Sequence, residues 1–182
     1  PGAEIMVTDL KNVSHSIEVN VYATDVSRPA ELETDFRDVI ALGKDGDLLK
    51  FLQACDEYGF RYVYNHPFFN QPRERIHARD VLNTAKYFRT AEFNLTQPQR
   101  MNRLTLAVAE HYGMGVVCNT DSHIGRFGKT RTLVKLDDPT DYNEVFDRIE
   151  SRDVRLKARD TAIKSFVKET NMFLRRFYER DE

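Results

Sequence analysis

Apolar and polar positions change period several times along the chain, and each change predicts a structural element. Strict alternation in Ile17–Ala23 is typical of a half-buried strand. Residues 47–58 carry apolar side chains at helical spacing, with Asp47 as an N-cap and Gly59 as the end. Residues 25–37 are polar and contain a proline, which predicts a loop. Further strands are predicted at 5–7, 60–64, 91–94, 115–119 and 133–136, and further helices at 79–88, 99–112, 142–150 and 158–178.

The order of these elements predicts the fold class. Strand, helix and strand follow one another at least three times before residue 120. This order favours parallel strands joined by crossover helices, in an α/β sheet or barrel. Asp137, Asp138 and Pro139 mark a boundary. We therefore expect an α/β portion over residues 1–136 and C-terminal helices over residues 137–182 that pack against it.

Composition and charge limit which kinds of partner and location are expected for the chain. The chain has 182 residues, 41% of them hydrophobic, which is enough for one main core. Its net charge of −2 makes extended nucleic-acid binding unexpected, so any phosphate contact has to come from a local cluster. No apolar run approaches the ~18–20 residues of a membrane span. The two cysteines, Cys55 and Cys118, cannot build a disulfide framework, which predicts a cytoplasmic location.

Candidate metal ligands follow two of the predicted strands. His66 comes directly after strand 60–64, and Asp121 and His123 come directly after strand 115–119. The C-terminal ends of parallel strands meet on one face of an α/β fold. Imidazole and carboxylate groups on such a face are ligands for Zn, Mn or Fe. Taken singly, His66 also fits a simple His-Pro turn, and His15 fits a polar residue at a strand edge.

Several short motifs together resemble one enzyme family. In chain order they are Pro1-Gly2-Ala3-Glu4, His15, Asn65-His66-Pro67, Ala91-Glu92-Phe93-Asn94, Thr120-Asp121-Ser122-His123, and the glycine-containing segment 125–132. The set resembles the PHP (polymerase and histidinol phosphatase) metal-dependent phosphoesterases. The resemblance runs from residue 1 to about residue 136.

The resemblance implies a fold and a metal site. The fold would be a distorted (β/α)7 TIM-like barrel of the PHP type that carries two or three divalent metal ions, Zn, Mn or Fe. The implied ligands are Glu4, His15, His66, Asp121 and His123. His123 is also a candidate catalytic proton donor, although a ligand donates a proton poorly.

One departure from the family concerns the start of the chain. The family begins with an H-x-H element and an Asp-His pair, and this sequence has neither. We therefore expect the N-terminal strands to be absent from this chain, and a missing N-terminal segment of the same polypeptide to be a partner.

Phosphate would be bound by cations near the proposed ligands. Arg126, Lys129 and Arg131 follow the Asp-x-His segment and are the first candidates. Arg73 and Arg75 form a second group after His66, and any of the five could simply lie on a solvated loop. Asn94 is expected to order the site by hydrogen bonding, with turn formation as the alternative.

These expectations lead to one main function and two alternatives. The main function is a metal-dependent phosphoesterase that hydrolyses a phosphate ester of a small molecule or nucleotide through a metal-activated water. The first alternative is a non-catalytic PHP-barrel remnant with a binding or structural role. The second is a nuclease that acts on nucleic-acid ends.

Overall fold

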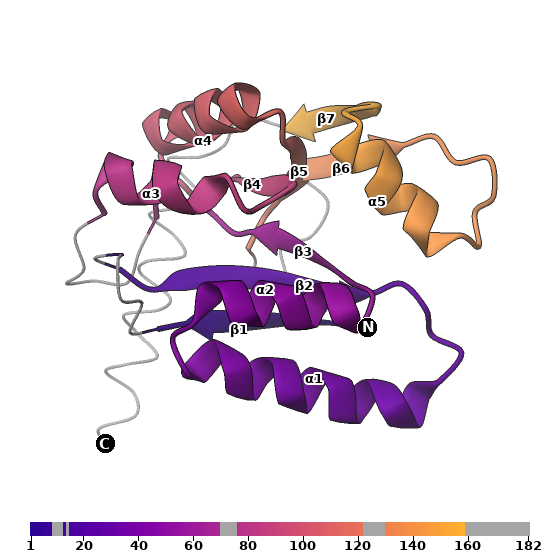
Figure 1. Cartoon of the computed structure of the whole chain (residues 1–182). Coiled ribbons are helices and arrows are strands. Elements are labelled where there is room, and N and C mark those ends of the chain that lie inside the picture. The colour runs from indigo at the N-terminus through magenta and orange to yellow at the C-terminus, as the bar shows by residue number, and fades with distance from the viewer. Residues whose placement is uncertain (9–12, 14, 70–75, 122–129, 159–182) are drawn as a thin grey trace, which may run out of the picture.

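The computed structural model describes residues 1–8, 13, 15–69, 76–121 and 130–158. These residues form a five-stranded sheet in the order β1-β2-β3-β4-β5 and a two-stranded sheet of β6 and β7 (Figure 1). The strands are β1 (Gly2–Val7), β2 (Ile17–Ala23), β3 (Phe60–Tyr64), β4 (Thr90–Asn94), β5 (Gly115–Asn119), β6 (Thr130–Val134) and β7 (Val154–Ala158). The helices are α1 (Pro29–Lys44), α2 (Leu48–Glu57), α3 (Ala78–Ala85), α4 (Gln99–Tyr112) and α5 (Tyr142–Glu150).

The second half of the large sheet confirms the predicted alternation. Strands β3, β4 and β5 are parallel, and a single helix, α3 or α4, connects each neighbouring pair. Helix α4 begins after Pro98 and ends at Gly113, whose φ of 70° is the left-handed conformation that glycine adopts without strain. Helix α2 likewise has Asp47 as its N-cap, with the carboxylate accepting from the Lys50 amide.

The first half of the sheet is antiparallel, which the sequence analysis did not predict. Strand β2 pairs antiparallel with both β1 and β3. Two helices, α1 and α2, lie between β2 and β3 in the chain and run side by side (Figure 1). One crossover helix returns the chain to the same end of a sheet, whereas a pair of antiparallel helices delivers it to the opposite end. The second helix is therefore the reason that β3 runs against β2.

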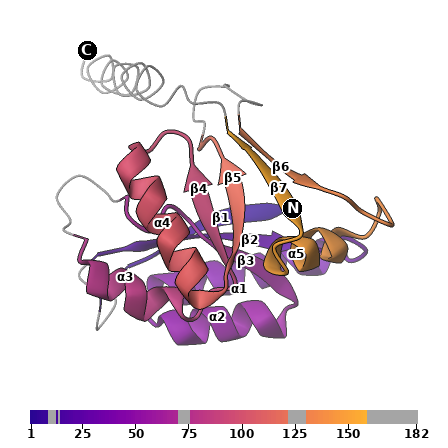
Figure 2. The ribbon, with the colours of Figure 1, turned by 90° about the horizontal axis from the view of Figure 1, so that it is seen from above.

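The prediction of a distorted (β/α)7 TIM-like barrel of the PHP type, with its N-terminal strands absent, is wrong. Within the described residues the large sheet is mixed and open, with β1 at one edge and β5 at the other (Figure 2). The barrel was implied by the PHP resemblance, and the expectation that β2 and β3 are parallel follows from residues 25–37, which were predicted as a loop but contain the first turns of α1. Pro29 occupies the first turn of that helix, where its missing N–H is not needed.

One hydrophobic core joins the large sheet to four helices. The cluster includes completely buried side chains from successive elements, such as Val19 of β2, Val39 of α1, Phe51 of α2 and Val81 of α3. Alternation along β1 and β2 directs Ile5, Val7, Val19 and their like into this core. The helices therefore cover one face of the sheet, and the intervening positions, including Glu4 and Glu18, lie on the other face.

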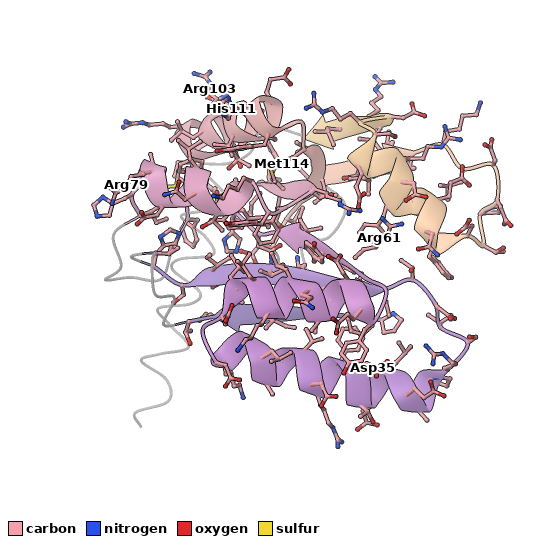
Figure 3. The ribbon with its side chains drawn as sticks, in the orientation of Figure 1. Asp35, Arg61, Arg79, Arg103, His111 and Met114 are labelled. Atoms are coloured by element: carbon pink, nitrogen blue, oxygen red, sulfur yellow. The ribbon has the colours of Figure 1, made fainter. Side chains whose placement is uncertain are left out.

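Helix α5 and the β6–β7 pair contact the large sheet, in part through polar side chains. Arg61 of β3 points toward α5 (Figure 3) and forms ion pairs with Asp147 at 2.7 Å and Glu150 at 3.2 Å. The Cys118 amide donates to the Thr132 hydroxyl at 2.8 Å and so links β5 to β6. Strand β7 was not predicted, and its pairing with β6 joins segments from both sides of the predicted boundary at residue 137. The predicted helix 158–178 lies outside the described residues except for residue 158.

Within the described ranges, no helix combines the length and apolarity that a bilayer crossing requires.

Candidate metal centre

Three strands bring two glutamates and a histidine together. Ligand atoms of Glu4, Glu18 and His66 all lie within 4.8 Å of one another. In the β1–β2 register, Glu4 is opposite Asn20 and Met6 is opposite Glu18, so the two glutamates are diagonal neighbours on one face. The sheet pairing thus places both carboxylates beside the end of β3.

Hydrogen bonds orient each member of this group. His66 Nε2 lies 3.0 Å from Glu18 Oε2. The Asn65 side-chain amide donates to Glu4 Oε1 at 2.7 Å, and the Asn65 backbone amide donates to the Glu18 carbonyl at 3.0 Å. Asn65 Oδ1 is buried and accepts no hydrogen bond from any described residue. A buried carbonyl oxygen without a donor beside two carboxylates is a further oxygen that fits a cation.

The backbone is strained at two of the predicted ligands. His66 has a φ of 25° and Asp121 a φ of 43°, and neither is glycine. Positive φ is costly for such residues, and His66 precedes Pro67, where extended backbone is normally favoured. Strain of this kind collects at functional sites, where the surrounding structure enforces it. Each residue lies two positions after the end of a strand of the parallel half.

A further carboxylate lies in the middle of β4. Glu92 is 1% exposed and accepts hydrogen bonds from the Asn94 side chain at 3.2 Å and from the Asn119 side chain. Burial raises the pKa of Glu92 to about 7; His66 opposes this shift, and the negative charge of Asp121 adds to it. The pKa of Glu4 is also raised, first by burial and then by Glu18, with Asp121 adding. The group therefore holds more negative charge than its surroundings neutralise.

His66 is the positive charge among these carboxylates. Burial alone would lower its pKa, but the Glu18 hydrogen bond and the charges of Glu92, Glu18 and Asp121 raise the pKa to about 9. A metal ion needs the neutral imidazole, so binding at this position would replace a proton by a cation.

The structure places the remaining predicted residues as follows. Asn94 donates to Glu92, and Asn102 contacts the Asn94 backbone through hydrogen bonds of 3.1 and 2.7 Å; the ordering role of Asn94 stays a prediction. His15 is buried just before β2 and is not part of the Glu4–Glu18–His66 group. Arg131 is exposed on β6. The other candidates lie outside the described residues; they are His123, Arg126, Lys129, Arg73 and Arg75.

Glu18 was not among the predicted site residues, and Glu92 had no predicted role. Glu18 is one of the polar positions of the alternating β2 pattern, where a solvated face is the ordinary interpretation. It approaches Glu4 only because β1 and β2 pair antiparallel. Glu92 stands in a motif that was recognised, but its almost complete burial, the sign of a special environment, is a property of the folded sheet.

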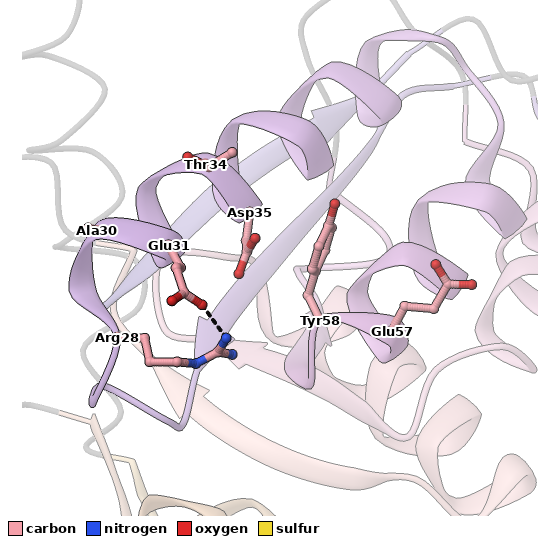
Figure 4. A pocket seen from close by; sticks show the side chains of 7 residues that line it. All are labelled: Arg28, Ala30, Glu31, Thr34, Asp35, Glu57 and Tyr58. Atoms are coloured by element: carbon pink, nitrogen blue, oxygen red, sulfur yellow. Dashed lines mark hydrogen bonds and ion pairs between the residues drawn. The ribbon is translucent and has the colours of Figure 1, made fainter.

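A surface hollow of about 540 Å³ lies elsewhere, on the helical side of the sheet (Figure 4). It is bounded by the first turns of α1 and the end of α2, and an ion pair between Arg28 and Glu31 crosses its rim. Its lining consists of Arg28, Ala30, Glu31, Thr34, Asp35, Glu57 and Tyr58. These residues include no histidine and lie on the face opposite Glu4 and Glu18. His111, on the outer side of α4 in Figure 3, is likewise separate from the metal-ligand group.

Comparisons with known proteins establish a likeness of fold. No family model and no curated protein sequence matches the chain. The structure is similar to the crystal structure of PsfC from Pseudomonas syringae PB-5123, with a TM-score of 0.55 and 17% sequence identity. The match covers 97% of this chain and 66% of PsfC, so the chain spans slightly less than two thirds of that protein. At this identity the chain shares a fold with PsfC, and the resemblance to PHP enzymes stays a prediction.

Proposed function

We propose that the chain is a divalent-metal-dependent phosphoesterase that hydrolyses a phosphate ester of a small molecule or nucleotide. The observation that carries the proposal is the Glu4–Glu18–His66 group, whose ligand atoms lie within 4.8 Å of one another. The PHP-like motifs point to the same chemistry, since Glu4, His66 and Asp121 all come from them.

The donor set fits a metal ion of the Zn, Mn or Fe type. Carboxylate oxygens and an imidazole nitrogen suit all three metals. Burial, and after it the negative charge of neighbouring carboxylates, raises the pKa of Glu4 and of Glu92, and a divalent cation would stabilise their charged forms. The unpaired Asn65 Oδ1 adds a neutral oxygen next to Glu4. Two or three ions, with Glu92 or Asp121 completing the ligand set, belong to the proposal.

Divalent ions bound in such a site would lower the pKa of a bound water, and their positive charge would stabilise the phosphoryl oxygens. The protein's own residues do the positioning. Asn65 holds Glu4, and the Glu18 backbone holds Asn65, so the carboxylates keep their places before substrate arrives. Arg131 is proposed to contact phosphate, because it adjoins Thr132, whose hydroxyl bonds to the strand that precedes Asp121.

Metal content and hydrolysis of an aryl phosphate with added Mn²⁺ test this proposal together. The wild-type protein should bind at least one equivalent of metal and hydrolyse the ester. Glu18→Gln, which keeps the size and one acceptor oxygen, should lose most of both. Glu57→Gln is the matched control, since Glu57 lines the separate hollow and should change neither. Equal metal content and rate in the Glu18 and Glu57 variants would overturn the assignment.

A non-catalytic role is an outcome of the same experiment. A protein that binds metal through Glu18 but hydrolyses neither the aryl ester nor a nucleotide monophosphate would have a binding or structural function. A cytoplasmic location also belongs to the proposal, supported by the free thiols of Cys55 and Cys118.

A further inference from the structure

The β6–β7 ribbon presents a row of basic side chains on one face. In its register Arg131 is opposite Lys157, and Leu133 is opposite Arg155. Directly opposed residues of an antiparallel pair point to the same side, so these four side chains share a face. All four residues are exposed, and Lys135 continues the alternation, also exposed. One face of the ribbon therefore carries four cations around a single leucine.

Neighbouring acidic residues are already paired with other arginines. Arg148 forms ion pairs with Asp137 at 2.8 Å, Glu144 at 3.1 Å and Asp153 at 2.7 Å. Among the described residues, no acidic side chain forms an ion pair with Lys135, Arg155 or Lys157. The positive charges of Lys135, Arg155 and Lys157 are therefore available to an external anion, despite the net charge of −2 of the whole chain.

The β6–β7 ribbon lies beside β5, the strand that precedes Asp121. Thr132 is bonded to β5 through the Cys118 amide, and β5 ends two residues before Asp121. Figure 2 shows β5 beside β6 and β7. The register pairs Thr130, the first residue of β6, with Ala158, the last residue of β7. A chain-like ligand on the ribbon could thus extend toward the strand ends that carry the metal ligands.

We propose that the exposed face of the β6–β7 ribbon binds a single strand of nucleic acid through its phosphates. Residues i and i+2 of a strand are about 6.6–6.8 Å apart, so the cations form a regular row rather than a point site. A nucleic-acid strand offers the complementary pattern of regularly repeated single negative charges, with flat bases for Leu133 to contact. A lipid surface fits less well, because it requires several large apolar side chains and this face has one. This binding needs no metal and so goes beyond the proposed function.

Fluorescence anisotropy with a short labelled single-stranded oligonucleotide, in EDTA, tests the ribbon. Arg155→Glu with Lys157→Glu should weaken binding about tenfold or more and flatten the salt dependence by about 0.7 log units per lost phosphate contact. Arg37→Glu with Lys50→Glu makes the same charge change on α1 and α2 and should leave affinity within about twofold. The milder Arg155→Gln with Lys157→Gln should give an intermediate loss, which keeps the test valid if the reversal affects folding.

Several results would overturn the proposal. These are absence of oligonucleotide binding by the wild-type protein, equal affinity in the ribbon and control variants, or ribbon-dependent binding to phosphatidylserine vesicles in place of the oligonucleotide. Tighter binding of a duplex of the same length would also overturn the proposal, because the ligand would then be double-stranded nucleic acid. Aryl phosphate hydrolysis, measured in parallel, should be the same in the ribbon variants as in wild type. If the wild-type protein binds the oligonucleotide but does not hydrolyse the aryl phosphate, that result contradicts the proposed phosphoesterase function and leaves the ribbon proposal standing.

Discussion

The two faces of the five-stranded sheet differ in chemistry although they are built from the same strands. On the face covered by helices, Val19, Val21 and Phe51 are completely buried among other apolar side chains. On the opposite face, Glu4, Glu18 and Glu92 gather around His66 with raised carboxylate pKa values at Glu4 and Glu92. The first arrangement stabilises the fold, and the second lowers the stability of the metal-free protein. The carboxylate face thus concentrates buried charge that apolar packing would avoid, as a proposed ligand site at a cost in stability would.

The largest expected effect concerns the helix-covered face. Phe51 of α2 is 0% exposed, so Phe51→Ala leaves a cavity in the core and should reduce the free energy of unfolding by about 3–5 kcal/mol. Leu49, on the same helix and 53% exposed, is the matched control, and Leu49→Ala should cost less than about 1 kcal/mol. Urea unfolding followed by circular dichroism gives both values. Similar losses in the two variants would contradict the core described above.

The next effect concerns metal affinity on the carboxylate face. Asn65→Leu removes the donor that holds Glu4 while keeping the size of the side chain. Loss of a group that orients a ligand should weaken Mn²⁺ binding about 10–100-fold. Asn83→Leu makes the same change at an exposed position of α3 and should leave the affinity unchanged. Calorimetric titration with Mn²⁺ measures the affinity of both variants. Equal affinities would mean that Asn65 does not support the candidate metal centre.

Most helices and strands of the fold could be predicted from the periodicity of the sequence, but α1 could not. Periodicity located β2, α2, β3, α4 and β5 because each has a clear apolar face and a marked end. It missed α1, whose buried side is narrow (Val39 and Gly43) and whose Pro29 suggested a loop. That omission removed one reversal of the chain, so β2 and β3 were expected to be parallel although they are antiparallel, whereas the barrel itself was implied by the PHP resemblance.

The candidate site was predictable where it depended on strand ends and not where it depended on pairing. His66 and Asp121 follow their strands directly in the sequence, and the structure places both with positive φ beside the carboxylates. Glu18 joins the group only through the antiparallel register of β1 and β2, which no local pattern specifies. The near-complete burial of Glu92 is likewise a long-range result of the fold.

A smaller effect is the pH dependence of the metal-free protein. The folded-state pKa of His66, about 9, is above its ordinary 6.5, so its stabilising contribution is complete below about pH 6.5 and is lost as pH rises through 9. The folded protein also holds the Glu92 proton more tightly than the unfolded chain, with a pKa of about 7 against 4.5. Both groups bind more protons in the folded state, so the free energy of unfolding should fall as pH rises between about 4.5 and 9.

Urea unfolding at a series of pH values in EDTA measures this decline. Glu18→Gln should reduce the decline above pH 7, because it removes the ion pair that raises the pKa of His66. Added Mn²⁺ should reverse the trend, since the metal binds the deprotonated ligands and stabilises the folded state. If the free energy of unfolding of the metal-free protein is constant or rises with pH across this range, the raised pKa values of His66 and Glu92 are contradicted.

The smallest expected effect isolates one charge on the carboxylate face. Asp121→Asn keeps a residue that tolerates the positive φ of 43° but removes the negative charge that helps raise the pKa of Glu92 and of Glu4. The pKa of Glu92 should move down from about 7, as measured by carboxyl ¹³C chemical shifts in the metal-free protein. Asp138→Asn, an exposed change near the start of α5, should leave the pKa of Glu92 where it is. An unchanged pKa of Glu92 in Asp121→Asn would mean that the charge of Asp121 does not act on Glu92. A downward shift of this pKa together with loss of aryl phosphate hydrolysis would mean that the same charge both destabilises the metal-free protein and is needed for the reaction.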